Sequence, residues 1–363
     1  MVTLAPSAGL LDDIDVWHGG SADLSGDFQH FLNAEDRGDP RPKGGKNSLT
    51  VAEAGAQIDR DGASWSGALG TAASVTYSFR STAPSKMPDD TGGFSRFNAA
   101  QIAATEKALQ AWADVANITF TRVGSDYSNS GQILFGNYST GADNAAAFAD
   151  YPPVGDVWVN VSIDYNASPV LFDYGRQVLL HEIGHAIGLA HPGDYDASIG
   201  TPTYAADAEY YEDTRQYSAM SYWASSNTGA DLRGFAASPQ LDDIAAAQRL
   251  YGANMTTRTG DTVYGFNSNA GRDYYTSVAG SDTIVAAIWD AGGTDTLDFS
   301  GYTVNQTIDL RQGHFSSVGG ALGNIAIAMG AVIENAVGDA ASDVITGNAS
   351  ANLLTGNGGT DGL

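Results

Sequence analysis

Cysteine is absent from the 363-residue sequence. Disulfide bonds, thiolate catalysis and cysteine-ligated zinc sites are therefore excluded. The side chains that remain as good metal ligands are those of histidine, aspartate, glutamate and tyrosine. Any metal site in this protein must draw its side-chain ligands from these four residue types.

Basic side chains are scarce, since 17 lysines and arginines stand against 42 aspartates and glutamates, a formal net charge of −25. This charge repels phosphate backbones and anionic lipid surfaces, which argues against nucleic acid as a partner. Carboxylates are ligands that calcium prefers, so the acidic excess also indicates a capacity for calcium. Long apolar runs are missing too. The longest, Asn324 to Ile333, is far short of the roughly 20 residues that a membrane-spanning helix needs, so no membrane span is expected.

Composition divides the chain into three regions. Residues 1–46 carry clusters of Gly, Asp and Pro with little apolar periodicity, which indicates an extended N-terminal arm or pro-segment. Residues 47–254 combine helical and strand patterns, as a first globular domain would. Residues 255–363 contain no lysine and are dominated by Gly, Asp, Asn, Thr and Ser, so a second domain of a different kind is expected there.

Apolar periodicity in the first domain predicts an α/β arrangement. Ser48 with Glu53, and separately Asn98, offer starting caps for helices, and Gly252 offers a stop signal. The expected helices span residues 48–60, 98–115, 177–190 and 242–251. The expected strands span residues 75–79, 118–123 and 132–135.

The C-terminus contains a nine-residue repeat. From residue 338 the sequence reads GDAASDVIT, GNASANLLT and GNGGTDGL. The eighth position of each copy is apolar: Ile345, Leu354 and Leu363. This period is that of the parallel β-roll, whose apolar residues point inward while Gly-rich turns bring Asp carboxylates to calcium. Asp343 and Asp361 occupy the carboxylate position, and Asn352 replaces it in the middle copy.

A histidine-rich segment, HEIGHAIGLAH, runs from His181 to His191. On a helix, His181 and His185 lie one turn apart, so both imidazoles can reach one cation with Glu182 beside them. Gly188 can turn the chain out of the helix and bring His191 round as a third ligand. Three neutral ligands leave a position open for water, which is the arrangement of a catalytic zinc. A bare HExxH also occurs by chance, and a buried histidine pair can be satisfied by hydrogen bonds, but the extended motif is far more specific.

A second signal lies downstream, where residues 217–223 read YSAMSYW. An extended HExxH motif followed by a methionine turn is the pattern of the metzincin metalloproteases. The segments HEIGHAIGLAHPGDY, SAMSYW and LDDIAAAQRLYGAN resemble segments of the serralysins, which are secreted bacterial metalloproteases. The resemblance extends from about Asn47 through the repeats. The resemblance implies an α+β metzincin protease domain, with a mixed sheet, helices and a zinc cleft. A calcium-binding all-β domain with parallel β-roll repeats would follow it.

The resemblance also implies roles for individual residues. The positions that match the zinc ligands are His181, His185 and His191. Glu182 matches the general base, Met220 the residue beneath the metal, and Tyr222 a catalytic tyrosine that is a further zinc ligand. Without the resemblance, Met220 would be interpreted as a core residue and Tyr222 as a packed aromatic.

Calcium is the second cofactor that the resemblance implies. The residues that match its ligands are Arg258, Gly260, Thr262, Asp290, Gly292, Gly293, Asp295, Glu334, Asp343 and Asp361. By themselves, such Gly-Asp clusters would be interpreted as β-turns with solvated charge. Eleven acidic residues face three basic ones between Arg258 and Leu363, so calcium would also relieve repulsion in this domain.

The implied function is that of an extracellular zinc-dependent endopeptidase stabilised by calcium, in which Glu182 activates a zinc-bound water. Implied partners are protein or peptide substrates, a type I secretion system and a proteinaceous inhibitor, and the protein would be a monomer. An extended substrate would add as a strand along residues 147–150, while residues 192–216 would shape the specificity pocket. Serralysins continue through more repeats to an export signal, so the roll is expected to be incomplete at Leu363. Residues 1–46 are longer than the usual pro-segment of the family.

Two other functions stay open at this point. One is a binding module, in which a calcium-loaded roll attaches the chain to a cell surface and the zinc domain is inert. The other is a different zinc hydrolase, such as an amidase or deacetylase that acts on small molecules. The presence of Glu182 and Tyr222 argues against an inert domain, and the methionine-turn sequence argues against the second alternative.

Overall fold

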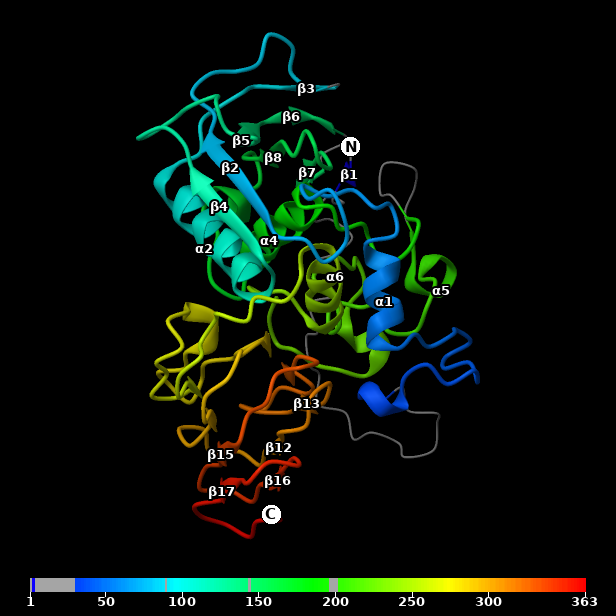
Figure 1. Cartoon of the computed structure of the whole chain (residues 1–363), viewed down its shortest axis with the longest axis vertical. Coiled ribbons are helices and arrows are strands. Elements are labelled where there is room, and N and C mark those ends of the chain that lie inside the picture. Colours follow the sequence, from blue (N-terminus) through cyan, green and yellow to red (C-terminus); the bar gives the residue numbers. More distant parts are fainter. Residues whose placement is uncertain (1, 4–29, 89, 143–144, 196–201) are drawn as a thin grey trace.

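The computed structural model describes residues 2–3, 30–88, 90–142, 145–195 and 202–363, which form two parts (Figure 1). The first part holds a mixed sheet flanked by helices. The second part begins near Val263 and consists of short strands and turns, coloured yellow to red in Figure 1. The expected order, an α+β domain followed by an all-β domain with parallel strands, is confirmed.

Among the described residues the main sheet has six strands, in the order β1-β7-β8-β5-β2-β4. Their bounds are Val2–Thr3 for β1, Ala147–Ala149 for β7, Val157–Asn160 for β8, Ile133–Tyr138 for β5, Ala73–Phe79 for β2 and Ile118–Arg122 for β4. Strands β8, β5, β2 and β4 are parallel neighbours, whereas β7 runs antiparallel to β8 and β1 antiparallel to β7. The three strands expected from periodicity are therefore confirmed. A separate antiparallel pair joins β3 (Thr91–Gly92) to β6 (Thr140–Gly141).

Helices pack on this sheet and on one another. The longer ones are α1 (Val51–Ile58), α2 (Ala99–Val115), α4 (Tyr174–Ala186) and α6 (Leu241–Tyr251). Shorter helical turns are η1 (Ala34–Asp36), α3 (Asp164–Ala167), α5 (Tyr204–Asp207), η4 (Ser225–Thr228) and η5 (Asp273–Tyr275). Helix α2 joins α4 to the sheet, because its fully buried Trp112 donates a 3.0 Å hydrogen bond to the carbonyl of Leu180. This hydrogen bond fixes α4 against α2.

Capping residues fix the helix ends, and one expected cap is wrong. Asn98 caps α2 with Gln101 as its reciprocal partner, and Gly252, at a φ of +79°, ends α6, both as expected. The cap of α1 is Thr50 and not Ser48, because Glu53 lies three residues after Thr50 and completes a capping box there. The Ser48 hydroxyl donates to the carboxylate of Glu212 instead.

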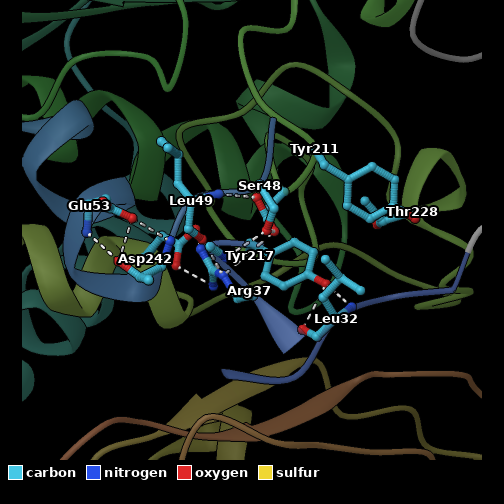
Figure 2. A network of polar contacts seen from close by, with 12 residues as sticks. Leu32, Arg37, Ser48, Leu49, Glu53, Tyr211, Tyr217, Thr228 and Asp242 are labelled. Atoms are coloured by element: carbon cyan, nitrogen blue, oxygen red, sulfur yellow. Dashed lines mark hydrogen bonds and ion pairs between the residues drawn. The ribbon is translucent and has the colours of Figure 1, made fainter. Parts of the chain in front are cut away.

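Residues 30–46 do not form the extended arm that the sequence predicts. Arg37 is buried and donates hydrogen bonds of 2.8 and 2.9 Å to the two carboxylate oxygens of Asp242 in α6. The amide of Leu32 donates to the hydroxyl of Tyr217 at 2.6 Å (Figure 2). These partners are about two hundred positions apart in the chain, so no local pattern reveals them. The rest of the expected arm, residues 4–29, lies outside the described residues.

The second part is a stack of short strands, whose named pairs are parallel except for one antiparallel pair. Its sheets are β9 (Val263–Gly265) with β11 (Thr296–Asp298), β15 (Asn335–Val337) and β17 (Leu353–Thr355); β10 (Ala286–Ile288) with β14 (Ile325–Ile327) and β13 (Phe315–Ser316); and β12 (Thr307–Asp309) with β16 (Val344–Thr346). Asn335 pairs with Leu353, eighteen positions on, which is two copies of the nine-residue repeat. Ile345 points inward as expected, whereas Leu363 is 67% exposed.

Ion pairs and a shared core join the two parts. Asp114, near the end of α2, accepts hydrogen bonds from Arg258 at 2.8 Å and from Arg272 at 2.7 Å. The indole of Trp289 donates to the carbonyl of Asn254 at 2.9 Å. One continuous set of buried apolar side chains extends through both parts. Across the described ranges, no helix combines the length and the apolar character that crossing a bilayer requires.

Candidate metal centre

Helix α4 carries the first two candidate ligands. Asp173 caps its N-terminus, and every residue from Tyr174 to Ala186 is buried, so the helix is fixed on all sides. His181 and His185 project from one face, one turn apart, as the sequence predicts. The helix ends at Ala186, several residues before the expected end at residue 190.

Gly188 explains the early end of the helix. Its φ is +110°, a conformation that residues with a side chain rarely adopt, and a Cβ atom there would lie 2.0 Å from the carbonyl oxygen of Ala63. The chain therefore leaves the helix sharply and returns His191 toward His181 and His185. Arg60 fixes the returning segment, because its guanidinium donates to the carbonyl of His191 at 2.6 Å.

The three imidazoles converge through one nitrogen each. The Nε2 atoms of His181 and His185 are 2.9 Å apart, and each is 3.2 Å from the Nε2 of His191. The opposite nitrogens, Nδ1, donate to backbone carbonyls: those of Ala219, Leu189 and Tyr195. A carbonyl oxygen only accepts, so Nδ1 carries the hydrogen in each ring. Three unprotonated Nε2 lone pairs therefore face one another.

Burial keeps these rings neutral. It lowers the pKa of His181 to about 4 and lowers the pKa of His185 and of His191 well below the usual value. Three neutral nitrogens that converge at about 3 Å repel unless a cation lies between them, and zinc takes such a set with its outer nitrogens held by carbonyls. Among the described residues this is the only group of three or more His, Asp or Glu side chains whose ligand atoms lie within 4.8 Å of one another. The donor set fits zinc.

Glu182 lies beside the triad and is fully buried. Neither of its carboxylate oxygens has a hydrogen-bond partner among the described residues. Burial raises the pKa of Glu182 well above its usual value. A buried carboxyl group without a partner is costly in an inert core, whereas a group that exchanges protons with a reactant needs this freedom.

The methionine turn lies directly under α4. A Cβ atom on Gly184 would be 2.4 Å from the sulfur of Met220, so helix α4 and the methionine turn are in direct contact at this point. Met220 is fully buried, as a residue beneath the metal would be. The ring of Tyr222 lies 4.4 Å from that of His191, centroid to centroid, and 6.2 Å from that of His181. Tyr222 is thus brought to the triad from a separate segment of the chain.

A buried carboxylate that the sequence analysis misses ties these segments together. Asp213 accepts hydrogen bonds from the Tyr195 hydroxyl at 2.9 Å, from the Ser221 hydroxyl at 2.7 Å and from the Trp223 indole at 3.1 Å. The Tyr195 ring stacks on His191, with 5.2 Å between centroids and 12° between planes. Asp213 therefore links the third histidine to both neighbours of Tyr222. Its only sequence signal is an acidic residue shortly before the methionine turn.

Several candidate calcium residues come together from three segments of the second part: the loop of Gly260 and Thr262, the loop of Gly293 and Asp295, and the segment of Glu334. The Asp295 carboxylate accepts from the Thr262 amide at 2.7 Å, and the Glu334 carboxylate accepts from the Asp295 amide at 2.8 Å. A Cβ atom on Gly293 would lie 2.6 Å from the carbonyl oxygen of Gly260, so the loops are in close contact. One oxygen of Asp295 is buried without a partner among the described residues. The structure thus brings these loops together, although their carboxylates do not form a cluster as tight as the histidine triad.

The other candidate calcium residues have more ordinary partners. The Arg258 side chain pairs with Asp114, so only its backbone oxygen can serve as a ligand. Asp290 accepts from the amide of Gly292 at 2.8 Å. In the repeats, Asp361 accepts from the amide of Asp343 at 3.0 Å, and Asp343 in turn accepts from the amides of Gln306 and Asp339: these contacts align successive coils.

Both parts of the chain match known protein families. Residues 71–218 match the family described as Matrixin, and residues 253–361 match the family described as Peptidase M10 serralysin C terminal. The chain is 49% identical to Serralysin C of Dickeya chrysanthemi, over 92% of this chain and 72% of that protein. It is 50% identical to Metallopeptidase AprA of Pseudomonas marginalis, over 88% of this chain and 69% of that protein. Serralysin of Proteus mirabilis is 43% identical over 83% of this chain.

Proposed function

Because the chain belongs to the serralysin family of metzincin zinc metalloendopeptidases, we propose that His181, His185 and His191 hold its zinc and that Glu182 is its general base. The observation that carries the proposal is the convergence of three neutral Nε2 atoms at 2.9 to 3.2 Å. When bound, zinc supplies Lewis acidity, which acidifies water and polarises a carbonyl oxygen. Proton transfer and stabilisation of the oxyanion are carried out by side chains of this protein.

Glu182 takes a proton from the attacking water and later delivers it to the departing amine. Its buried carboxyl group, with both oxygens unpartnered among the described residues, supports this role. The raised pKa of Glu182 supports this role too. A group that both takes and returns a proton works best when its pKa is shifted toward the operating pH. Tyr222, whose ring lies against His191, donates a hydrogen bond to the oxyanion that develops on the substrate.

The substrate binds as an added strand along β7. In the structure Val2–Thr3 already pair antiparallel with Ala147–Ala149, in the register Val2 to Ala149 and Thr3 to Phe148. The edge of β7 can thus pair with an extended segment, as β-strand addition requires, and β1 is the segment that occupies it in this structure. Helix α4 packs against β7, so a peptide on this edge lies near the histidines.

Calcium binds in the second part and stabilises it. The support comes from the contacts of Asp295 with the loop of Thr262 and with Glu334, and from the excess of acidic side chains in residues 255–363. We assign the protease domain to residues 47–254 and the calcium-binding domain to residues 255–363. By analogy with the family, the enzyme acts outside the cell after type I export, and a proteinaceous inhibitor is a further partner.

Casein hydrolysis tests the proposal. The purified protein should cleave casein, lose activity with a zinc-selective chelator, and regain it on addition of zinc but not of calcium. Metal analysis should find one zinc per chain. Loss of zinc without loss of hydrolysis would refute the assignment. A protein that binds calcium and a cell surface but cleaves nothing would instead support the binding module, and hydrolysis of small amides alone would support a different zinc hydrolase.

A further inference from the structure

The two residues that flank Tyr222 in the chain share one buried hydrogen-bond partner. The hydroxyl of Ser221 donates to the carboxylate of Asp213 at 2.7 Å, and the indole of Trp223 donates to the same carboxylate at 3.1 Å. The Ser221 hydroxyl also accepts from the backbone amide of Trp223 at 3.1 Å, so the two flanking residues are bonded to each other. The backbone on both sides of Tyr222 is therefore fixed to Asp213.

The same carboxylate holds the residue that supports the third histidine. The hydroxyl of Tyr195 donates to Asp213 at 2.9 Å, and the backbone carbonyl of Tyr195 accepts from Nδ1 of His191 at 3.1 Å. The rings of Tyr195 and Tyr222 are in contact, with 5.0 Å between their centroids. Asp213 thus acts on Tyr222 by two routes, through the backbone of its neighbours and through the ring of Tyr195.

The arrangement of the three donors requires a carboxylate. Asp213 is fully buried, and burying a charged group is costly unless hydrogen bonds compensate for the lost water. A carboxylate accepts at both oxygens, here from two hydroxyls at Oδ1 and from the indole at Oδ2. Asparagine has one accepting oxygen, so at least one donor would face an N–H group instead. An apolar side chain would fill the space at a lower cost of desolvation, so filling space does not account for the charge.

We propose that Asp213 is a positioning residue that holds Tyr222 and His191 in one fixed arrangement, in which the Tyr222 hydroxyl can reach the substrate oxyanion. This inference rests on the proposed function, in which Tyr222 stabilises the oxyanion. Without Asp213 the tyrosine would occupy a range of positions, which weakens a contact that matters mainly in the transition state. His191 would also be held less firmly, because the carbonyl that orients its ring belongs to Tyr195.

A double-mutant cycle with Tyr222 tests the proposal. Asp213→Asn should lower kcat on a peptide by about tenfold with little change in KM, because a misplaced oxyanion donor affects turnover more than binding. In the Tyr222→Phe background the same substitution should lower kcat by less than about twofold, because the hydroxyl that Asp213 positions is already absent. A purely structural role would lower kcat by the same factor in both backgrounds.

Zinc affinity gives a second readout, which does not depend on catalysis. Competition with a chromophoric chelator measures it. The affinity should fall by about tenfold in Asp213→Asn, because an outer hydrogen bond that orients a zinc-binding histidine is weakened. Circular dichroism shows whether the variant is folded. If Asp213→Asn does not fold, Tyr195→Phe replaces it in the same cycle, because it removes one donor and keeps the ring on His191. Tyr195→Phe should then lower kcat only where the Tyr222 hydroxyl is present.

Asp339→Asn is the matched control. Asp339 is a buried residue of the second part, and its carboxylate also accepts from three donors: the backbone amides of Val304 and Ala341 and the side-chain amide of Gln306. This variant should lower the melting temperature but keep kcat and zinc affinity.

The results separate this inference from the proposed function. Equal losses of kcat in the two Tyr222 backgrounds, or an unchanged kcat or zinc affinity in a folded Asp213→Asn variant, would overturn this inference alone. An unaltered protein that cleaves neither casein nor peptide would overturn the proposed function and this inference with it.

Discussion

Arg37 and Asp242, 205 positions apart, form a buried two-point ion pair with N–O distances of 2.8 and 2.9 Å. Asp242 pulls the pKa of Arg37 upward against the effect of burial, so the arginine stays charged. Glu212 lies 3.8 Å from the same guanidinium. Residues 30–46 are thereby part of the folded body, anchored to α6 (Figure 2).

Removing one partner of this pair should destabilise the protein strongly. Arg37→Met leaves two acidic groups buried without their cation, and we expect a loss of about 3–5 kcal/mol in the free energy of unfolding. Urea unfolding followed by tryptophan fluorescence measures it. Arg41→Met, at an exposed arginine that pairs with Asp39, is the control and should not shift the midpoint. Midpoints that coincide for all three proteins would mean that the pair contributes nothing.

The N-terminal strand should compete with substrate. Deleting residues 1–29 removes β1 from the edge of β7 and should raise the initial rate on a short peptide, because the edge becomes free. Deleting residues 1–46 should instead lower stability, since it removes Arg37 and the contacts of Leu32. Rates are compared in the first minutes, before self-cleavage. An unchanged rate for the shorter deletion would show that β1 does not restrict access.

Tyr222→Phe should lower kcat by about 10²–10³-fold, the usual effect of losing one oxyanion donor. KM should change much less, because the hydroxyl acts mainly in the transition state. The ring is retained, so its packing against His191 and the zinc content should persist. Steady-state kinetics on one peptide measures kcat and KM separately. A variant with wild-type kcat would remove Tyr222 from the mechanism.

Calcium stabilisation should grow as pH rises from 5 to 8. Burial, with Asp290, Glu334 and Asp261 nearby, raises the pKa of Asp295 to about 7 in the metal-free protein. Below that pH calcium must displace a proton, so its affinity falls by up to about tenfold per pH unit from this group. Without calcium, Asp295 takes up more protons folded than unfolded between about pH 4 and 7, so its contribution to stability decreases as pH rises.

The melting temperature with and without calcium at each pH measures this effect. Asp295→Asn should weaken the calcium response and flatten its pH dependence. Asp282→Asn, at a carboxylate that accepts from the nearby amides of Val278 and Ala279, should keep both. A calcium response that is flat from pH 5 to 8 in the unaltered protein would contradict the assignment of Asp295.

Local patterns predict local features of this protein well. The Asn98 cap and the helical face of His181 and His185 depend on residues within one or two turns, and the structure contains both. The helix end before Gly188 is harder to predict. A side chain at position 188 would clash with the carbonyl oxygen of Ala63, which is far away in the chain. Asp213 has only a weak local signature, an acidic residue shortly before the methionine turn, because its three donors come from two other segments. Long-range polar pairs of this kind are visible only once the fold is known.

The role of Glu182 is the central claim, and the Glu182→Gln variant tests it most directly. The variant keeps the size of the side chain but cannot take up a proton, so hydrolysis of casein and of peptides should fall by at least about 10²-fold. Zinc should remain at one ion per chain, because the three histidine Nε2 atoms converge without Glu182. The measurement is kcat and zinc content on the same preparation. Full activity in the variant, or loss of zinc together with activity, would contradict the mechanism.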